Sequence, residues 1–596
     1  GTIGSAANRI QTNTAYLGLN SASHQYVTET DAVTVSARTT SNGNVDIATL
    51  NGTLVVNVTN GISGISANGT GSVTLSGTAS GTSNGLQLNY GITGNTLQLT
   101  GVANGSGSGI FYAGVTITST GAMTLNGTST GNGAGIYSWA GTMTAGGLIT
   151  LTGTDNANQG LNFHGGLTIN SNGTFAVGQD SVLIRGGSSA TGVSMNGMTI
   201  NNNSTNGNTR IEAVTGSIDT QAGFNNAIIN ANTAGGIFIS AGNGLATAGG
   251  DFNVGNRLSI TQRSNAGVTL QTSGTGNLYS PAVVNQGTGA VVLAAGTALN
   301  AAHTGDATGG NVKVNSGNVT QSSTGQTLIF TGSAANTAAV SSIVNGFSAD
   351  LYLSAVGANA QNAKSNSAYS DLTGNAIATG STRVYFREKI NLNTTLQALQ
   401  GITYGQSLPG DINSQVLGNA QNPSTLTNAL AAGTFHVALS SVLDAAAAGQ
   451  GTVLSPSYSS SGNLSANTYQ VSVQSYDYTG LSSSLTVTPK TIQTAVLQAG
   501  TSVYGETVTG GAVSLGSDVL AGDAVSAAGS VSIAGAVYST SGQLKAGTYS
   551  QTVAGGLSGA DASNYSFAGA SALANYTVTP RALTALVSDV QTTYGT

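Results

Sequence analysis

Cysteine is absent from the 596-residue chain, and charged residues make up only 6% of it. The lack of cysteine excludes disulfide bridges, zinc sites with thiolate ligands and thiol catalysis. An average soluble chain carries roughly 25% charged residues. Lysine and arginine total 14 against 20 aspartates and glutamates, which gives a net charge of −6. Without a basic stripe, the chain is not expected to bind nucleic acid.

Long apolar runs are also missing. No stretch long enough to cross a bilayer is apolar throughout, so no segment is expected to span a membrane as a helix. Aromatic residues are 5% of the chain, too few for a large conventional aromatic core. No secretory signal peptide is visible at Gly1, and we expect the chain to be a portion of a longer protein.

Proline is scarce and unevenly placed. Only Pro281 precedes residue 400, and the other prolines all follow it. The densest group of charges, residues 383–390, lies just before this change of composition. These observations predict a domain junction near residues 381–392.

Glycine is the leading residue at 87, and serine, threonine, asparagine and alanine fill most of the remainder. Low charge and many short β-branched runs, such as residues 71–75 and 114–118, argue against disorder. Strict alternation of apolar and polar residues, as in residues 73–75, is typical of strands with one buried face. The spacing typical of helices is rare before residue 390.

A short repeat runs through the first region. One recurring phrase occupies residues 74–78, 99–101, 124–128 and 150–154, and a second phrase follows each copy. The second phrase begins at Gly85, Gly109, Gly135 and Gly160, so its spacing is nearly constant. Each period holds two or three short strands broken by glycine and asparagine.

A repeat of this length, roughly 25 residues, fits one coil of a right-handed parallel β-helix. One coil cannot bury its apolar stripe alone, whereas stacking at a strand spacing of about 4.8 Å aligns equivalent positions into continuous ladders. Residues 1–390 are therefore predicted to form a β-helical shaft of on the order of 15 coils. An array of β-sandwiches is the alternative, but the repeat is too short to make one sandwich.

The second region repeats at a longer spacing. Tyr404-Gly405, Tyr504-Gly505 and Tyr594-Gly595 form one series, and the phrases ending in Pro489 and Pro580 form another. A third series ends in Tyr469 and Tyr549. Units of this size, about 90–100 residues with many short strands, predict small β-sandwiches. The predicted domains are 391–488, 489–579 and the start of a third repeat at 580–596.

These phrases, together with residues 562–565 (Ala-Ser-Asn-Tyr), resemble the MBG repeat of the Tyr-Gly type over residues 390–596. The first unit departs from that pattern, because its middle is longer and it lacks the Ala-Ser-Asn-Tyr signature. Residues 1–4, 8–12 and 26–29 resemble the β-helical shaft of filamentous-haemagglutinin-like proteins exported by two-partner secretion. The resemblance implies an extracellular bacterial surface protein and an outer-membrane secretion partner during export. It supplies no catalytic residues.

Two aspartates give an enzymatic alternative, a β-helix carbohydrate-active enzyme (polysaccharide lyase or hydrolase). Asp155 and Asp180 are about one coil length apart, and His164 and Arg185 lie in the same stretch. Paired acids could flank a sugar if they were about 5–10 Å apart. The simpler interpretation is that Asp155 is a turn residue and Asp180 starts a strand.

Other candidate groups have weaker chemical meaning. Thr116 and Thr118 recur at Thr142 and Thr144 and could form a flat threonine ladder, although solvent-facing strand threonines explain the pattern equally well. Trp139, Tyr137 and Tyr112 could form an aromatic sugar platform or simply pack. Four isolated histidines lack metal-ligand spacing, and the Gly-Gly-Asp sequence ending at Asp251 does not recur as a calcium repeat would. The four histidines are His24, His164, His303 and His436.

The sequence therefore predicts a non-catalytic extracellular adhesin or structural filament at the bacterial cell surface. It would act by its length and by distributed surface contacts. No catalytic, cofactor-binding or metal-binding residues are assigned. Copies of itself in a fibre and a cell-surface glycan or protein are the expected partners, and turnover of a glycan would favour the enzymatic alternative.

Overall fold

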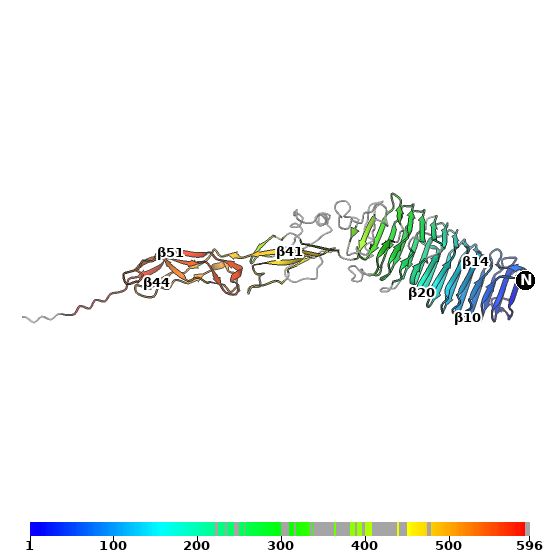
Figure 1. Ribbon diagram of the computed structural model, residues 1–596, viewed down its shortest axis with the longest axis horizontal. Coiled ribbons are helices and arrows are strands. Elements are labelled where there is room, and N and C mark those ends of the chain that lie inside the picture. Colours follow the sequence, from blue (N-terminus) through cyan, green and yellow to red (C-terminus); the bar gives the residue numbers. More distant parts are fainter. Residues whose placement is uncertain are drawn as a thin grey trace, which may run out of the picture. The chain divides into compact units, whose positions relative to one another are not determined.

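In the computed structural model the chain forms two compact units, Gly1–Ile390 and Asn391–Thr596, coloured from blue to red along the sequence in Figure 1. None of the described residues lies in an α-helix, so the predicted all-β class is confirmed. The structure describes residues 1–220, 225–232, 235–242, 249–254, 257–299, 309–314, 318–333, 337, 363–364, 382–387, 390–395, 398, 400–407, 438–439, 450–453, 455–473 and 478–589.

The first unit is a parallel β-helix, as predicted, in which each coil lies on the previous one (Figure 1). Its right-handed sense stays a prediction, based on the general preference of parallel crossovers. Three ladders of parallel strands form its walls. The first ladder contains β1 (Ile10–Thr12), β3 (Gln25–Glu29), β5 (Val45–Thr49), β10 (Val73–Gly81), β13 (Leu97–Gly105), β15 (Met123–Ser129), β17 (Ile149–Asp155), the start of β20 (Asp180–Asn196), the start of β22 (Asn208–Asp219), β24 (Ile237–Ala241), β27 (Val268–Thr272), β30 (Val291–Ala294), β33 (Thr327–Thr331) and β35 (Thr382–Phe386).

The other two walls share several long strands, which turn the corner between them. The second ladder contains β2 (Tyr16–Ser21), β4 (Val33–Thr39), β6 (Leu54–Val56), β11 (Leu86–Leu88), the starts of β14 (Ile110–Ser119) and β16 (Ala134–Ala145), β18 (Gln159–His164), the ends of β20 and β22, β25 (Phe252–Asn253), β28 (Leu278–Ser280) and β31 (Val312–Val314). The third contains β9 (Ile65–Ser66), β12 (Ile92–Gly94), the ends of β14 and β16, β19 (Leu167–Ser171), β21 (Thr199–Asn202), β23 (Ala227–Ala231), β26 (Leu258–Gln262), β29 (Ala282–Asn285) and β32 (Val319–Gln321). Two short pairings lie outside these ladders: β7 (Val58–Thr59) with β8 (Ile62–Ser63), and β34 (Ala363–Lys364) with β35.

One continuous apolar core fills the interior of the shaft. Equivalent inward positions on successive coils hold the same kind of residue, as in the row Ile47, Leu75, Leu99, Leu125 and Leu151, all fully buried. The same buried cluster extends from Leu19 to Phe386. The alternation of buried and exposed residues along each strand is the physical basis of the two-residue pattern in the sequence.

The predicted coil period is observed in the strand register. Leu86, Ile110, Ile136 and Leu161 are successive partners on one ladder, with the spacings of the glycines that precede them. Coils elsewhere are shorter, as between the register partners Ile10 and Val27, or longer where loops are inserted at the corners, as between Ile149 and Val182. The shaft therefore keeps its ladders while the period changes.

Paired glycines explain why the two short sequence motifs recur in the first region. A methyl group on Gly127 or Gly186 would overlap the carbonyl oxygen of Gly135 or Gly192, on the next wall of the same coil. Each of these five coils thus makes one corner where two backbone segments approach more closely than a side chain permits. The pairs are Gly77 with Gly85, Gly101 with Gly109, Gly127 with Gly135, Gly153 with Gly160, and Gly186 with Gly192.

The second unit contains two small β-modules, which we call the first module (residues 391–488) and the second module (residues 489–579). The first has one sheet of β36 (Ile390–Thr395), β41 (Tyr478–Thr488), β40 (Asn467–Val473), β39 (Gln450–Val453) and β38 (Ala438–Leu439), with β37 (Ile402–Thr403) beside β41. The second has a sheet of β44 (Gly500–Val503), β51 (Gly569–Thr579), β48 (Gly547–Ala554) and β47 (Val531–Ala534).

Three short ladders complete the second module as a small sandwich. They pair β42 (Lys490–Thr491) with β50 (Tyr565–Ser566), β43 (Val496–Leu497) with β45 (Val513–Ser514), and β46 (Ser526–Ala527) with β49 (Leu557–Ser558). Two 3₁₀ turns, η5 (Gly516–Asp518) and η6 (Ala562–Asn564), connect them. Ile492, Leu497 and Leu515 share a buried cluster with Val553 of the main sheet, so the short ladders cover one face of that sheet.

The two modules have the same strand register. Tyr469 pairs with Leu485 in the first module, and Tyr549 pairs with Tyr576 in the second. In both, a short N-terminal strand lies parallel to the last strand, with Thr403 opposite Thr488 and Val503 opposite Thr579. Residues 580–589 contain no strand, and residues 590–596, including the Tyr-Gly pair of the expected third repeat, lie outside the described residues.

Candidate functional site

The two aspartates proposed as a catalytic pair do not stack. Asp155 ends β17 and Asp180 begins β20, and these neighbouring strands are in register from Ile149–Val182 to Thr154–Gly187. Both aspartates lie outside this matched segment, at its opposite ends. The length of that segment already separates them by roughly 17 Å. That distance exceeds the roughly 5–10 Å between the two carboxyl groups that act on a glycosidic bond, so the alternative in which they share one site is contradicted.

Each aspartate instead has a structural partner. The Asp155 carboxylate accepts hydrogen bonds from the backbone N–H groups of Ala157 and Asn158, the former at 2.9 Å. This is the turn role that the sequence favoured. Asp180 accepts from Arg210 at 3.0 Å. The carboxylate of each residue therefore holds a loop or a coil in place.

Asp180 belongs to a group of four charged residues on the outer face of β20 and β22. Arg210 contacts Glu212 at 3.8 Å, and Glu212 contacts Arg185 at 2.8 Å. Arg210 also lies over the ring of Phe238 on the next coil, 4.9 Å from its centre. Arg185, singled out in the sequence, is consequently committed to an ion pair that bridges two coils.

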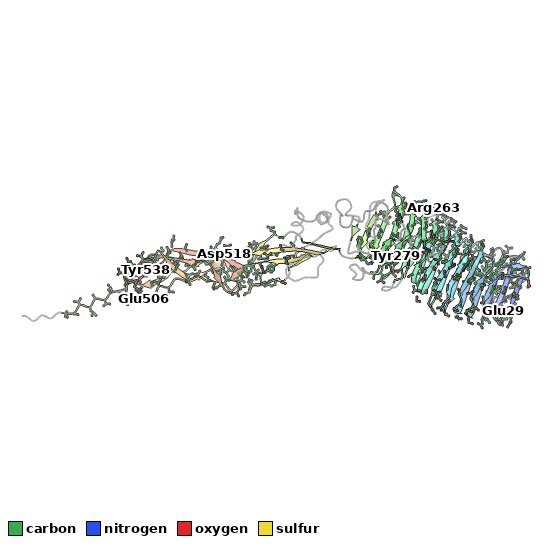
Figure 2. All side chains as sticks on the ribbon, in the orientation of Figure 1. Glu29, Arg263, Tyr279, Glu506, Asp518 and Tyr538 are labelled. Atoms are coloured by element: carbon green, nitrogen blue, oxygen red, sulfur yellow. The ribbon has the colours of Figure 1, made fainter. Side chains whose placement is uncertain are left out.

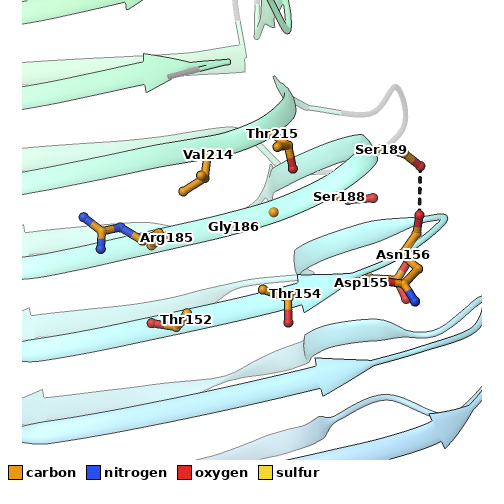
Figure 3. Close-up of a pocket in the computed structure, with 11 residues that line it drawn as sticks. Thr152, Thr154, Asp155, Asn156, Arg185, Gly186, Ser188, Ser189, Val214 and Thr215 are labelled. Carbon is orange, nitrogen blue, oxygen red and sulfur yellow. Dashed lines mark hydrogen bonds between the residues drawn. The ribbon is translucent and has the colours of Figure 1, made fainter. Parts of the chain in front are cut away.

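A shallow hollow of about 520 Å³ lies beside this group, and Figure 3 shows its lining. The outward row across it is Thr154, Gly187 and Thr215 on three successive coils, so Gly187 leaves a side-chain-sized gap between two threonines. Arg185 stands at one side and Asn156 at the other (Figure 3), where the Ser189 hydroxyl donates to the Asn156 carbonyl at 3.0 Å. Hydroxyl and guanidinium groups could hydrogen-bond a polar ligand here.

Asp219 is a carboxyl group that the sequence did not single out. Burial raises its pKa, although hydrogen bonds from Thr191 and Ser194 oppose the shift. A raised pKa in a carboxyl group is a feature of general acids. Its register partners are Ser194 on one side and Asn253 on the other, so no second carboxyl group adjoins it along the ladder.

A group of aromatic side chains lies on the outer face of the second wall, and we call Phe111, Tyr137, Trp139 and His164 the aromatic patch. The rings of Phe111 and Tyr137 stack with an interplanar angle of 3° and centres 5.6 Å apart. His164 lies 5.9 Å from Tyr137 and 4.9 Å from Trp139. Three successive coils, β14, β16 and β18, contribute these residues.

Trp139 lies at a β-bulge. Tyr112 pairs with Ser138 and Ala113 pairs with Ala140, so Trp139 is an extra residue in β16. It follows the buried Ser138 and lies on the same outer face as Tyr137, where it is 56% exposed. Tyr112, which the sequence grouped with Trp139, points inward and is fully buried. Its hydroxyl contacts the carbonyl groups of Val115 and Thr142, and burial raises its pKa. The patch therefore contains Phe111 and His164 in place of Tyr112.

The recurring threonines are in register, with Thr116 opposite Thr142 and Thr118 opposite Thr144. The second row changes to asparagine on the next coils, where Asn201 donates to Asn170 at 3.1 Å and Asn230 donates to Asn201 at 3.0 Å. A second asparagine row joins Asn172, Asn203 and Asn232 in the same way. The threonines thus form no extended flat surface, and side-chain amides link the coils beyond them.

Among the residues that the structure describes, His24, His164 and Asp251 belong to no group of metal ligands. The His24 ring accepts a hydrogen bond from the Asn44 amide, and His164 belongs to the aromatic patch. Asp251 accepts from the Asn277 amide on the next coil at 2.7 Å. His303 and His436 lie outside the described residues. In the part of the chain that the structure describes, no three histidine, aspartate or glutamate side chains are grouped as metal ligands.

The chain matches no protein-family model, no curated protein and no solved structure. Within the described ranges, no helix is long and apolar enough to cross a membrane.

Proposed function

We propose that this chain is part of a non-catalytic extracellular surface protein of the adhesin type, in which a stiff shaft presents ligand contacts. The observation that carries the proposal is the aromatic patch, which places an exposed indole on a shaft whose outer face otherwise bears mostly threonine, serine, asparagine and glycine. Large aromatic side chains held rigidly at a surface contribute strongly to binding, because little conformational entropy is lost.

The packing of the patch supports a binding role. His164 and Tyr137 both lie beside the Trp139 ring, at 4.9 and 6.5 Å between ring centres. The strands beneath are fixed by parallel ladders on both sides. An indole held in this way offers a preorganised apolar surface, which suits the C–H-rich face of a sugar ring or an apolar side chain of a partner protein.

The build of the shaft supports a mechanical role. Its core is continuous across the coils, and the coils are bonded to their neighbours by backbone hydrogen bonds. The asparagine rows add side-chain hydrogen bonds between the coils of residues 170–232. Such nearest-neighbour stacking gives a structure that holds its surface residues at fixed positions over a long distance. Contacts repeated along many molecules would add by avidity.

The cellular setting belongs to the proposal and follows from the resemblance described for the sequence. The protein would be exported to the bacterial cell surface with the help of an outer-membrane partner, and copies could assemble into fibres. The absence of cysteine is compatible with export, because no thiol can cross-link a partly transported chain.

The test is binding of the full chain to a glycan array and to whole cells, comparing wild type with Trp139→Ala. Loss of a hot-spot tryptophan costs about 2 kcal/mol or more, or roughly 30-fold in affinity. The control is Tyr16→Ala, because Tyr16 is 69% exposed on the same unit but outside the patch. Equal binding by wild type and Trp139→Ala, or turnover of a glycan, would contradict the proposal.

A further inference from the structure

The two modules are joined by a carboxylate that is held from three sides. The Asp523 carboxylate of the second module accepts from the hydroxyl of Tyr404 at 2.6 Å and from the backbone N–H of Ser461 at 3.0 Å, both in the first module. Within its own module it accepts from the Tyr565 hydroxyl at 2.6 Å. Burial alone would raise the pKa of Asp523, but these hydrogen bonds outweigh it and the pKa is lowered. The carboxylate is therefore bound in its charged form.

A second pair of side chains continues this junction. Asp561 accepts from the Ser460 N–H of the first module at 3.0 Å and from the Ala524 N–H of its own module at 2.8 Å. Asn564 accepts from the Ala466 N–H at 2.7 Å. The first module thus supplies the hydroxyl groups of Tyr404, Ser460 and Ser461 and three backbone N–H groups, all donors, and the second module supplies acceptor oxygens.

Apolar contacts close the same junction. The rings of Tyr404 and Tyr565 meet edge to face, with centres 5.3 Å apart. Both tyrosines belong to a buried cluster that also contains residues of each module. Tyr404 is only 1% exposed. The junction is consequently packed, and the two modules are held in one arrangement.

The donor side of the junction is present a second time, at the other end of the second module. Tyr504 corresponds to Tyr404, and Ser539 and Ser541 correspond to Ser459 and Ser461. In each copy the two serine hydroxyls hydrogen-bond the tyrosine. We call Tyr504, Ser539 and Ser541 the distal socket.

The turns that carry the two serine pairs have the same backbone bonds. Gly462 donates to Ser459 at 2.9 Å, and Gly542 donates to Ser539 at 3.0 Å. The bridge between Tyr458 and Leu464 recurs between Tyr538 and Leu544. In Figure 2, Tyr538 and Glu506 mark this end of the second module, and Asp518 lies toward the opposite end. The distal socket therefore faces away from the first module.

We infer that the distal socket binds the carboxylate of a further module of the same type, which would supply an aspartate at the position of Asp523. The counterparts of the groups that enclose Asp523 between the two modules are not buried at this end of the second module. Tyr504 is half-buried and Ser541 is exposed, whereas Tyr404 is buried. The inference goes beyond the adhesin proposal and does not depend on it.

Charge favours an acidic occupant. Hydrogen bonds from Ser539 and Ser541, together with the positive charge of Lys545, lower the pKa of Tyr504. Arg581 lies beside the backbone of Gly505, where a methyl group would be 3.4 Å from its guanidinium nitrogen. Two cations therefore stand next to the distal socket. The first junction has a cation, Lys490, in the position of Arg581, but the neutral Ser465 stands in the position of Lys545.

A further module is a better occupant than a second copy of this chain. Asp523 and Asp561 are already bonded to the first module, so a second copy could offer them only by opening its own junction.

The test is a lengthened chain in which residues 1–579 are followed directly by a second copy of residues 489–589. Hydrogen exchange is measured at Thr540, Ser541 and Ala546, the counterparts of Ser460, Ser461 and Ala466. Docking should slow their exchange by at least about tenfold relative to the normal chain, which corresponds to about 1.4 kcal/mol. Slow exchange at Val553 in the added copy verifies that this copy folds.

The matched control carries Asp523→Asn and Asp561→Asn in the added copy only, and it should lose the protection. Protection that persists without the carboxylates, or a socket that stays unprotected beside a folded added copy, overturns the inference. A second measurement needs no added module. The same two substitutions in the normal chain should raise exchange at Ser460 and Ser461 to the level of Thr540 and Ser541, and unchanged exchange there also overturns it.

Discussion

Two adjacent glycines allow a sharp test of how the coils close their corners. A methyl carbon built on Gly186 would lie 1.9 Å from the carbonyl oxygen of Gly192 and 2.6 Å from its carbonyl carbon. The same methyl on Gly187 would lie 3.5 Å from the Thr215 hydroxyl and 3.8 Å from the Thr154 methyl, which is ordinary contact. Neither glycine has a backbone conformation that excludes alanine. The two substitutions therefore differ only in the space available.

Gly186→Ala requires the backbone segments at residues 186 and 192 to separate, because the added methyl overlaps the opposite carbonyl group. Both segments are bonded to coils above and below, so the movement cannot be absorbed locally. Overpacking costs about 1–3 kcal/mol and occasionally more, and we expect about 3 kcal/mol here because the obstacle is backbone. Gly187→Ala is expected to leave the stability unchanged, or to raise it by about 0.4–1 kcal/mol because alanine lowers the conformational entropy of the unfolded chain.

Hydrogen exchange is the suitable assay, because a stacked array does not unfold as a single two-state unit. For Gly186→Ala, a loss of about 3 kcal/mol corresponds to roughly 150-fold faster exchange in β17, β20 and β22, with little change in β5. Gly187→Ala should leave all of these strands unchanged. Equal behaviour of the two variants would refute the close-approach explanation of the paired glycines.

Two further predictions concern the module junction and the last coils of the shaft. The pKa values of Asp523 and Asp561 are lowered in the folded protein, so their contribution to stability is present above the unfolded value of about 3.9 and is lost as the pH falls through the lowered values. The melting temperature of the second unit should therefore be constant near neutral pH and fall below about pH 4. It should fall less steeply in the double variant Asp523→Asn/Asp561→Asn. An identical decline in that variant would contradict the assignment. Arg387 is fully buried and donates to the carbonyl groups of Ala295 and Gly310, so Arg387→Met should cost about 2–4 kcal/mol. The lost stability should appear as faster hydrogen exchange in β30 and β33 but not in β10 or β13. Equal acceleration in all four strands, or none, would refute this local role of Arg387.

The second wall of the shaft shows which contacts a repeated sequence pattern can predict. Gly85, Gly109, Gly135 and Gly160 repeat at nearly constant spacing, and the strands that follow them are partners in register. The prediction succeeded because a parallel β-helix pairs each residue with the one a single coil away, so its long-range contacts are written as a sequence period. The matching register of the two modules was visible for the same reason, as phrases that recur once in each module.

The candidate site depended on features with no period. Asp155 and Asp180 are one coil length apart in sequence, but an inserted loop lengthens that coil and shifts the register, so they lie at opposite ends of neighbouring strands. Trp139 is an extra residue in β16 with no register partner on β14, so the coil period does not predict its place in the patch. Tyr112 is in register with the buried Ser138 and faces the core, because successive residues of a strand point to opposite faces.

The sequence by itself determined the all-β class, the coil length and the spacing of the modules, because each of these is a local pattern repeated along the chain. Only the tertiary structure decided that Tyr404 meets Asp523, 119 residues away, and that His164 lies beside Trp139. These contacts occur once, between side chains brought together by turns of variable length. No repetition marks them, and their partners are chosen by the packing of whole walls and modules.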